Sequence, residues 1–150
     1  MAAAFQKQKL LSRSEYHAFK VIEDTVASAD RGYRIFAQAN LGEILRSPDD
    51  NAYRSINSKR VDILVVDGGG WPILAAEYQG TGHYQGVAAA RDAIKKEALR
   101  RAGVKYMEIS ATENDAQIRT RLCEQLGWHA VASTEAGSPR PASQDAAAAR

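Results

Sequence analysis

The sequence predicts an α/β domain in which a mixed β-sheet is flanked by helices, in the order helix, three strands, helix, strand, helix. Three observations lead to this prediction. The chain has 150 residues, a length typical of one domain. Two strand-like segments, 61–67 and 72–79, are separated by a glycine-rich turn, which is typical of a β-hairpin. Segments with apolar residues at helical spacing lie before and after that hairpin.

The residues before the hairpin predict a helix, a strand and a long loop. A helix is expected over 12–28, because its first residues fit a capping box, S-x-x-E, and apolar residues recur at helical spacing. Residues 33–38 alternate as a strand does, and residues 41–45 predict a short helical turn. The polar segment 47–59 is expected to be a loop, whose length suggests function or mobility.

The residues after the hairpin predict a helix, a strand and a last helix. A glycine-rich loop over 80–86 leads into a helix over 87–102, which Gly103 ends. Residues 104–109 form a strand, and the last helix ends at Gly127. The folded unit is therefore expected to be residues 10–129. It lies between a flexible N-terminus, 1–9, and a disordered tail rich in Ala, Ser and Pro, 130–150.

The composition excludes several classes of protein. A net charge of +2 excludes a polybasic binder, and no apolar run reaches the roughly 20 residues of a membrane span. One cysteine, Cys123, excludes an intramolecular disulfide framework and a cysteine-based zinc cluster. Residues 1–9 have no apolar stretch typical of a secretion signal. We therefore expect a cytoplasmic protein.

Two acidic residues in the hairpin are the strongest sign of chemistry. Asp62 and Glu77 lie in otherwise apolar strands, where a carboxylate is costly unless it is paired, hydrogen-bonded or bound to metal. If the numbers of paired positions add to 139 or 141, both side chains point to one face and suit a shared divalent cation. The alternative is that Asp62 lies at a solvated strand end and Glu77 faces water on an edge strand.

Several motifs in order resemble the PD-(D/E)xK restriction-endonuclease-like superfamily, and most closely small bacterial domains related to very-short-patch-repair-type nucleases. They are Arg60-Val61-Asp62-Ile63-Leu64, then Leu74-Ala75-Ala76-Glu77-Tyr78-Gln79-Gly80, His83, and Arg91-Asp92-Ala93-Ile94-Lys95. The resemblance covers residues 10–109. It implies a restriction-endonuclease-like α-β-β-β-α-β core, here with an extra C-terminal helix.

The resemblance also implies a Mg²⁺- or Mn²⁺-dependent nuclease acting on DNA. Asp62 and Glu77 would hold the metal. The motif lysine would fall at position 79, where this chain has Gln79. A lysine from the following helix, Lys95 or Lys96, could replace it, and Lys95 is the one we expect because it completes the R-D-x-x-K motif. The alternative is that Lys95 belongs to a solvated helix face with ordinary ion pairs.

Two further residues are candidates for the same site. His83, in the glycine-rich loop, could serve as an acid, a base or a phosphate contact. Glu15 matches a helix glutamate that assists the metal in some members of the superfamily. The alternative for Glu15 is that it is the capping-box partner of Ser12. Gln38, at the end of the preceding strand, is expected to support the site without direct contact.

The charge distribution indicates where a nucleic acid would bind. Residues 61–90 carry three acidic side chains and no Lys or Arg, whereas the segments on both sides carry a basic excess. This pattern is typical of a cation site flanked by phosphate contacts, for which we expect Arg54, Lys59, Arg60, Arg91 and Lys96. Two alternatives stay open: a nuclease-fold module that binds nucleic acid without cleavage, and a partner-binding subunit. A homodimer or a larger complex is compatible with each of them.

Overall fold

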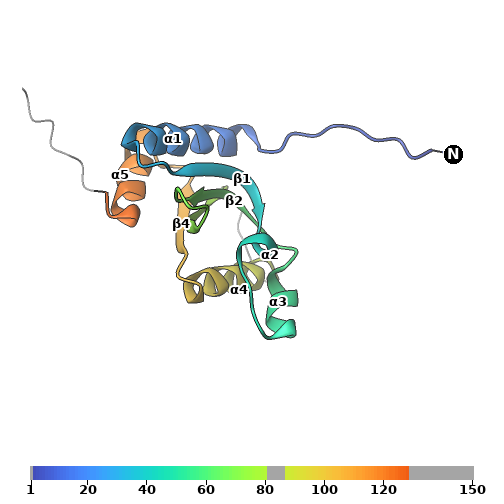
Figure 1. Cartoon of the computed structure of the whole chain (residues 1–150). Coiled ribbons are helices and arrows are strands. Elements are labelled where there is room, and N and C mark those ends of the chain that lie inside the picture. The colour runs from blue at the N-terminus through green and yellow to red at the C-terminus, as the bar shows by residue number, and fades with distance from the viewer. Residues whose placement is uncertain (1, 81–86, 129–150) are drawn as a thin grey trace, which may run out of the picture.

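The computed structural model of the chain describes residues 2–80 and 87–128. Its elements are α1 (Arg13–Ala29), β1 (Arg34–Asn40), α2 (Leu41–Ile44), α3 (Asp50–Ile56), β2 (Arg60–Val66), β3 (Pro72–Gln79), α4 (Val87–Arg101), β4 (Lys105–Ser110) and α5 (Asp115–Leu126). Figure 1 shows these elements along the chain. The predicted tail, 130–150, and most of the predicted loop, including His83, lie outside the described residues.

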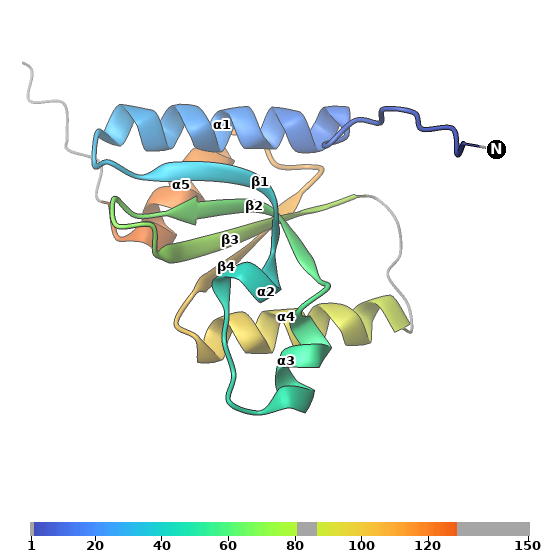
Figure 2. The same ribbon diagram turned by 45° about the vertical axis from the view of Figure 1, so that its right-hand side comes forward.

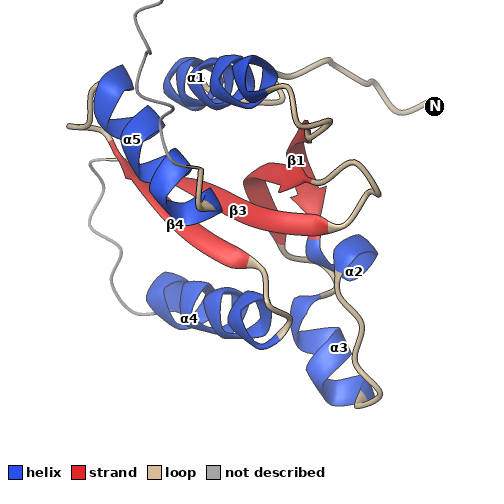
Figure 3. Cartoon of the chain, turned by 60° about the vertical axis from the view of Figure 1, so that its left-hand side comes forward, coloured by secondary structure: helices blue, strands red, loops and turns tan. Residues whose placement is uncertain are grey.

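Four strands form one mixed sheet in the order β1-β2-β3-β4. β1, β2 and β3 are antiparallel neighbours, and β4 runs parallel to β3. Figure 3 shows the strands of this sheet in red between the helices. The predicted α/β fold with a mixed sheet flanked by helices is therefore confirmed. The hairpin strands end within a residue of the predicted positions, because β-branched runs bounded by a Gly-rich turn are a strong local signal.

The helices cover the two faces of this sheet separately (Figure 2). α1 and α5 lie over one face and bury thirteen residues with it, among them Ile22, Ile63 and Leu122. α4, with α2 and α3, lies over the other face, where nine buried residues include Leu64, Ala75 and Leu99. We call these the α1/α5 face and the α4 face.

The segment 47–59 differs from its prediction, because it contains the helix α3 rather than a continuous loop. The Asp49 carboxylate accepts from the backbone N–H groups of Asn51 (2.8 Å) and Ala52 (3.1 Å) and so caps the helix. The Tyr53 hydroxyl donates to the Gly42 carbonyl at 3.0 Å. Ile56 is the buried residue of α3. A two-turn helix with one buried side chain has almost no apolar periodicity. The sequence pattern therefore did not indicate α3.

The ends of the described chain add little regular structure. Residues 2–12 form neither helix nor strand, and Ser12 then caps α1 through the predicted capping box with Glu15. In the described part of the chain, no helix has the length and apolar character needed to cross a bilayer.

Candidate functional site

Asp62 and Glu77 point to the same face of the sheet. The pairs Ile63–Ala76 and Leu64–Ala75 fix the β2–β3 register, and extending it by one residue places Asp62 opposite Glu77. The register is therefore the one that brings the two carboxylates together. Because side chains alternate along a strand, Asp62 and Glu77 share the α4 face with Leu64 and Ala75.

The Asp62 carboxylate accepts a backbone hydrogen bond from β3 where the regular pairing of β2 and β3 ends. The paired positions of β2 and β3 end at Ile63–Ala76, and beyond this point the Tyr78 N–H donates to Asp62 Oδ2 at 2.9 Å. The bond holds one oxygen of Asp62 at the place where the two strands separate. The Asp62 carboxylate also lies close enough to Glu77 to raise the pKa of that carboxyl.

Glu77 is paired with a lysine from the helix that covers it. Lys95 Nζ lies 2.6 Å from Glu77 Oε1, and the two side chains are 13% and 12% exposed. The water-facing interpretation of Glu77 is therefore wrong, since β3 is an interior strand. The interpretation of Lys95 as part of a solvated helix face is also wrong, because its side chain is only 13% exposed. It holds instead for Glu97, which pairs with Arg100 and Arg101 on the exposed side of α4.

Burial and charge perturb the protonation of Glu77. Burial raises its pKa, the bond from Lys95 lowers it, and the Asp62 carboxylate raises it again; the result is a pKa of about 7 instead of 4.5. Near neutral pH Glu77 is therefore partly protonated. A carboxyl with this property in a partly buried cluster is typical of functional sites.

Tyr106 is a member of this cluster that the sequence did not reveal. Burial raises the pKa of its hydroxyl, and so do the nearby carboxylates of Glu77 and Glu108. Lys96 Nζ lies 5.3 Å from the centre of its ring and 3.6 Å from Glu108. The parallel register pairs Glu108 with Glu77. The sequence shows Tyr106 and Glu108 two residues apart in one strand, but only the strand pairing shows that they lie near Glu77.

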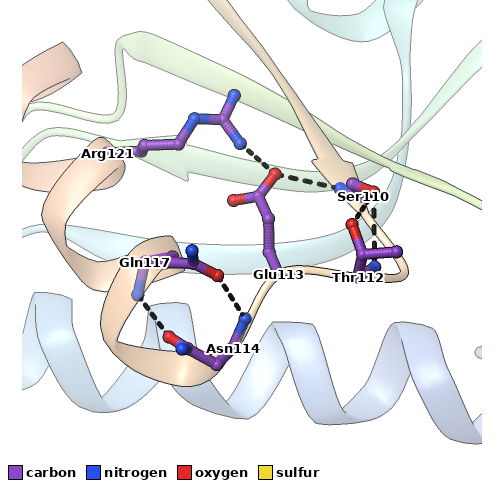
Figure 4. Close-up of polar contacts among 6 residues, drawn as sticks. All are labelled: Ser110, Thr112, Glu113, Asn114, Gln117 and Arg121. Atoms are coloured by element: carbon purple, nitrogen blue, oxygen red, sulfur yellow. Dashed lines mark hydrogen bonds and ion pairs between the residues drawn. The ribbon is translucent and has the colours of Figure 1, made fainter.

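The loop after β4 begins beside Gln79 and is held by side-chain hydrogen bonds. Gln79 pairs with Ser110 in the β3–β4 register. Glu113 Oε1 accepts from the Ser110 N–H at 3.1 Å and from Arg121. The Ser110 and Thr112 hydroxyl oxygens lie 2.9 Å apart. Figure 4 shows these contacts as dashed lines. Burial would raise the pKa of Glu113, but the bonds from Arg121 and Ser110 lower it overall. The Gln79 end of β3 therefore faces a charged and well-anchored loop.

The remaining predicted residues are only partly placed at this site. Glu15 accepts from the Ser12 N–H at 3.2 Å in the capping box and lies on α1, which covers the opposite face; its catalytic role stays a prediction. His83 lies outside the described residues. The predicted phosphate contacts lie on α3, on α4, at the start of β2 and, for Lys59, directly before β2: Arg54, Lys59, Arg60, Arg91 and Lys96.

The donor set fits a hard divalent cation held by few protein ligands. Among residues 2–80 and 87–128, no group of three or more His, Cys, Asp or Glu side chains is arranged to hold a metal. Asp62 and Glu77 nevertheless supply two adjacent carboxylates, and Mg²⁺ commonly uses one or two carboxylates and keeps its waters. The Lys95 ammonium already occupies a cation position beside Glu77.

The fold and the site define the class of protein: a mixed-sheet α/β domain with a partly buried pair of strand carboxylates and a lysine from the helix that covers them. Residues 7–126 match the family described as "Protein of unknown function (DUF2726)". The chain belongs to this family, and the match includes every predicted site residue.

Two relatives support this membership. An uncharacterized protein of Sinorhizobium fredii (strain NBRC 101917 / NGR234), y4bI, is 48% identical over 126 residues, which cover 84% of this chain and 91% of that protein. An uncharacterized protein of Haemophilus influenzae (strain ATCC 51907 / DSM 11121 / KW20 / Rd) is 42% identical over 114 residues, which cover 76% of this chain and 60% of that protein. No solved structure matches the chain.

Proposed function

We propose that the chain is a Mg²⁺- or Mn²⁺-dependent phosphodiester hydrolase, a nuclease, that acts on DNA. The observation that carries this proposal is the convergence of two strand carboxylates with a helix lysine, whose Nζ lies 2.6 Å from Glu77 Oε1. The resemblance to the PD-(D/E)xK superfamily implies the same three groups. Here the lysine comes from α4 instead of from position 79.

Each side chain has a distinct role in the proposed reaction. Asp62 and Glu77 would hold the cation, which when bound lowers the pKa of a water and neutralises charge on the phosphate. Lys95 opposes the protonation of Glu77, because its ammonium lowers the pKa that burial and Asp62 raise. The Lys95 ammonium, which lies beside Glu77, could also donate to a phosphate oxygen bound next to that carboxylate. Gln79, on the same face, supplies an amide that can orient a water or a phosphate oxygen.

The basic residues support a nucleic-acid substrate. Arg54 and Arg91 are exposed on α3 and α4, the helices that pack on the α4 face and contact each other. Arg60 begins β2, two residues before Asp62. Cations on the same side as the carboxylates can bind phosphates on either side of the bond to be cut, since phosphate contacts position a nucleic acid without reading its sequence.

The experiment that tests this proposal is a cleavage assay with plasmid DNA and with DNA and RNA oligonucleotides, in Mn²⁺ and in EDTA. We expect Mn²⁺-dependent cleavage of DNA that Asp62→Ala and Glu77→Ala abolish while circular dichroism shows an intact fold. Glu108→Gln is the matched control, because this carboxylate lies opposite Glu77 but is 47% exposed and pairs with Lys96. It should retain cleavage.

A second function is favoured by one observation, the glutamine at the position of the motif lysine. A nuclease-fold module that binds nucleic acid or a protein partner without cutting would give no product in Mn²⁺. Its binding of DNA would weaken with salt and would be unchanged in Asp62→Ala. This combination of results would contradict the nuclease proposal.

A further inference from the structure

Two residues other than glycine have a left-handed backbone in the described part of the chain, Asp30 (φ 48°) and Gln38 (φ 55°). Asp30 has an ordinary explanation, because it is the C-cap of α1, where helices commonly end in this conformation. Gln38 lies inside β1, where extended backbone is the rule. A left-handed backbone at a residue with a side chain is sterically costly, so this position requires a reason.

Gln38 lies opposite Asp62. The pairs Ala37–Ile63 and Ala39–Val61 flank this position, and the ladder pairs no residues between them. Since one residue separates the two pairs on each strand, no residue is inserted, and the irregularity is not a β-bulge. The left-handed backbone of Gln38 therefore interrupts the ladder at the site carboxylate and nowhere else along this strand pair.

The direction in which the side chains of β2 point changes at this interruption. Ile63 packs into the α1/α5 face, whereas Val61 packs into the α4 face. In a regular strand, residues two apart point to the same face. A rotation of β2 therefore takes place at Asp62, between the two, and it coincides with the unusual backbone of its neighbour. It is also the point at which Asp62 Oδ2 accepts the Tyr78 N–H.

We propose that Gln38 is a positioning residue: its left-handed backbone produces the rotation that holds the Asp62 carboxylate against β3 and beside Glu77. The consequence for metal binding rests on the proposed nuclease function. The geometric part does not, because it concerns only the bond that the Tyr78 N–H donates to Asp62 Oδ2.

Three variants test this inference. Gln38→Val disfavours the left-handed backbone, since a β-branched residue rarely adopts it, whereas Gln38→Gly adopts it without steric cost. Asp30→Val is the matched control, because it opposes the same conformation at the end of α1. The measurements are the hydrogen-exchange rate of the Tyr78 amide in EDTA, the affinity for Mn²⁺ and the melting temperature.

We expect Gln38→Val to raise the Tyr78 exchange rate and to weaken Mn²⁺ binding, each by about tenfold, as loss of a supporting residue typically does. Gln38→Gly should leave both values close to those of the original chain. Asp30→Val should lower the melting temperature without changing Tyr78 exchange relative to other amides of β3.

Two results would overturn the inference: unchanged Tyr78 exchange in Gln38→Val, or equal losses in Gln38→Gly and Gln38→Val. The second would assign the effect to the side chain. If the original chain neither binds Mn²⁺ nor cuts DNA, the proposed function fails. The Tyr78 exchange rates still decide whether Gln38 positions Asp62.

Discussion

On the α1/α5 face of the sheet the buried residues are all apolar, and the partly buried ion pair Glu113–Arg121 lies at the α5 side, whereas the α4 face combines a smaller apolar cluster with partly buried charge. Thirteen buried residues fill the first face and nine the second. The space that apolar side chains leave on the α4 face is taken by Asp62, Glu77, Lys95 and Tyr106. One face therefore stabilises the domain, and the other supports polar groups that a well-packed core would exclude.

The largest expected effect on stability comes from the α1/α5 face. Ile63 is fully buried there, next to Asp62 in sequence but on the other side of the sheet. Ile63→Ala should lower the free energy of unfolding by about 2–5 kcal/mol, because it leaves a cavity. Urea denaturation would measure this. Asp62→Asn should change stability far less, since the asparagine carbonyl can still accept from Tyr78; an equal loss in both variants would contradict the division between the faces.

The next effect concerns activity and compares two adjacent lysines of α4. Lys95→Met removes the cation beside Glu77 and should lower the rate of DNA cleavage by about 100-fold, the size typical of losing one stabilising donor. Lys96→Met is the control: Lys96 is 58% exposed and is an expected phosphate contact, so its loss should weaken DNA binding but change the rate at saturating DNA little. Initial rates at saturating Mn²⁺ and DNA would measure both variants. Equal losses of rate would contradict a specific role of Lys95 in the cleavage step.

A smaller effect should appear in the pH dependence of stability without metal. The folded protein binds the Glu77 proton more tightly than the unfolded chain does, because the pKa rises from 4.5 to about 7. This contribution to stability is complete below pH 4.5 and is lost as the pH rises through 7, by on the order of 1–3 kcal/mol. Urea denaturation in EDTA from pH 4 to 8 would measure it. Glu77→Gln should remove this part of the slope, and a slope equal to that of the original chain would contradict the assignment.

The smallest effects should come from the start of α1. Ser12→Ala removes the N-cap and should lower the free energy of unfolding by about 1 kcal/mol. Glu15→Gln keeps a side chain that can complete the capping box and should change neither the melting temperature nor the cleavage rate appreciably. A large loss of cleavage by Glu15→Gln at an unchanged melting temperature would instead give Glu15 the catalytic role that the superfamily resemblance implies.

Local patterns in the sequence were sufficient for most of the fold. The capping box at Ser12, the β-branched run of β2 and the glycine after α4 each fix an element through its own residues. α3 was missed because its stability depends on contacts outside the helix, such as the bond from Tyr53 to the Gly42 carbonyl. Tyr106 was missed because an alternating aromatic residue in β4 looks like ordinary packing until its neighbours are known.

The sequence by itself determined that two carboxylates lie in apolar strands of one hairpin and that a lysine follows in the next helix. It left open whether these groups meet, because a shift of one residue in the β2–β3 register would send one carboxylate to the other face. The tertiary structure decided this: the register places Asp62 opposite Glu77, and the packing of α4 brings Lys95 to within 2.6 Å. The backbone of Gln38 was also decided there, since a left-handed residue inside a strand leaves no mark in the order of the amino acids.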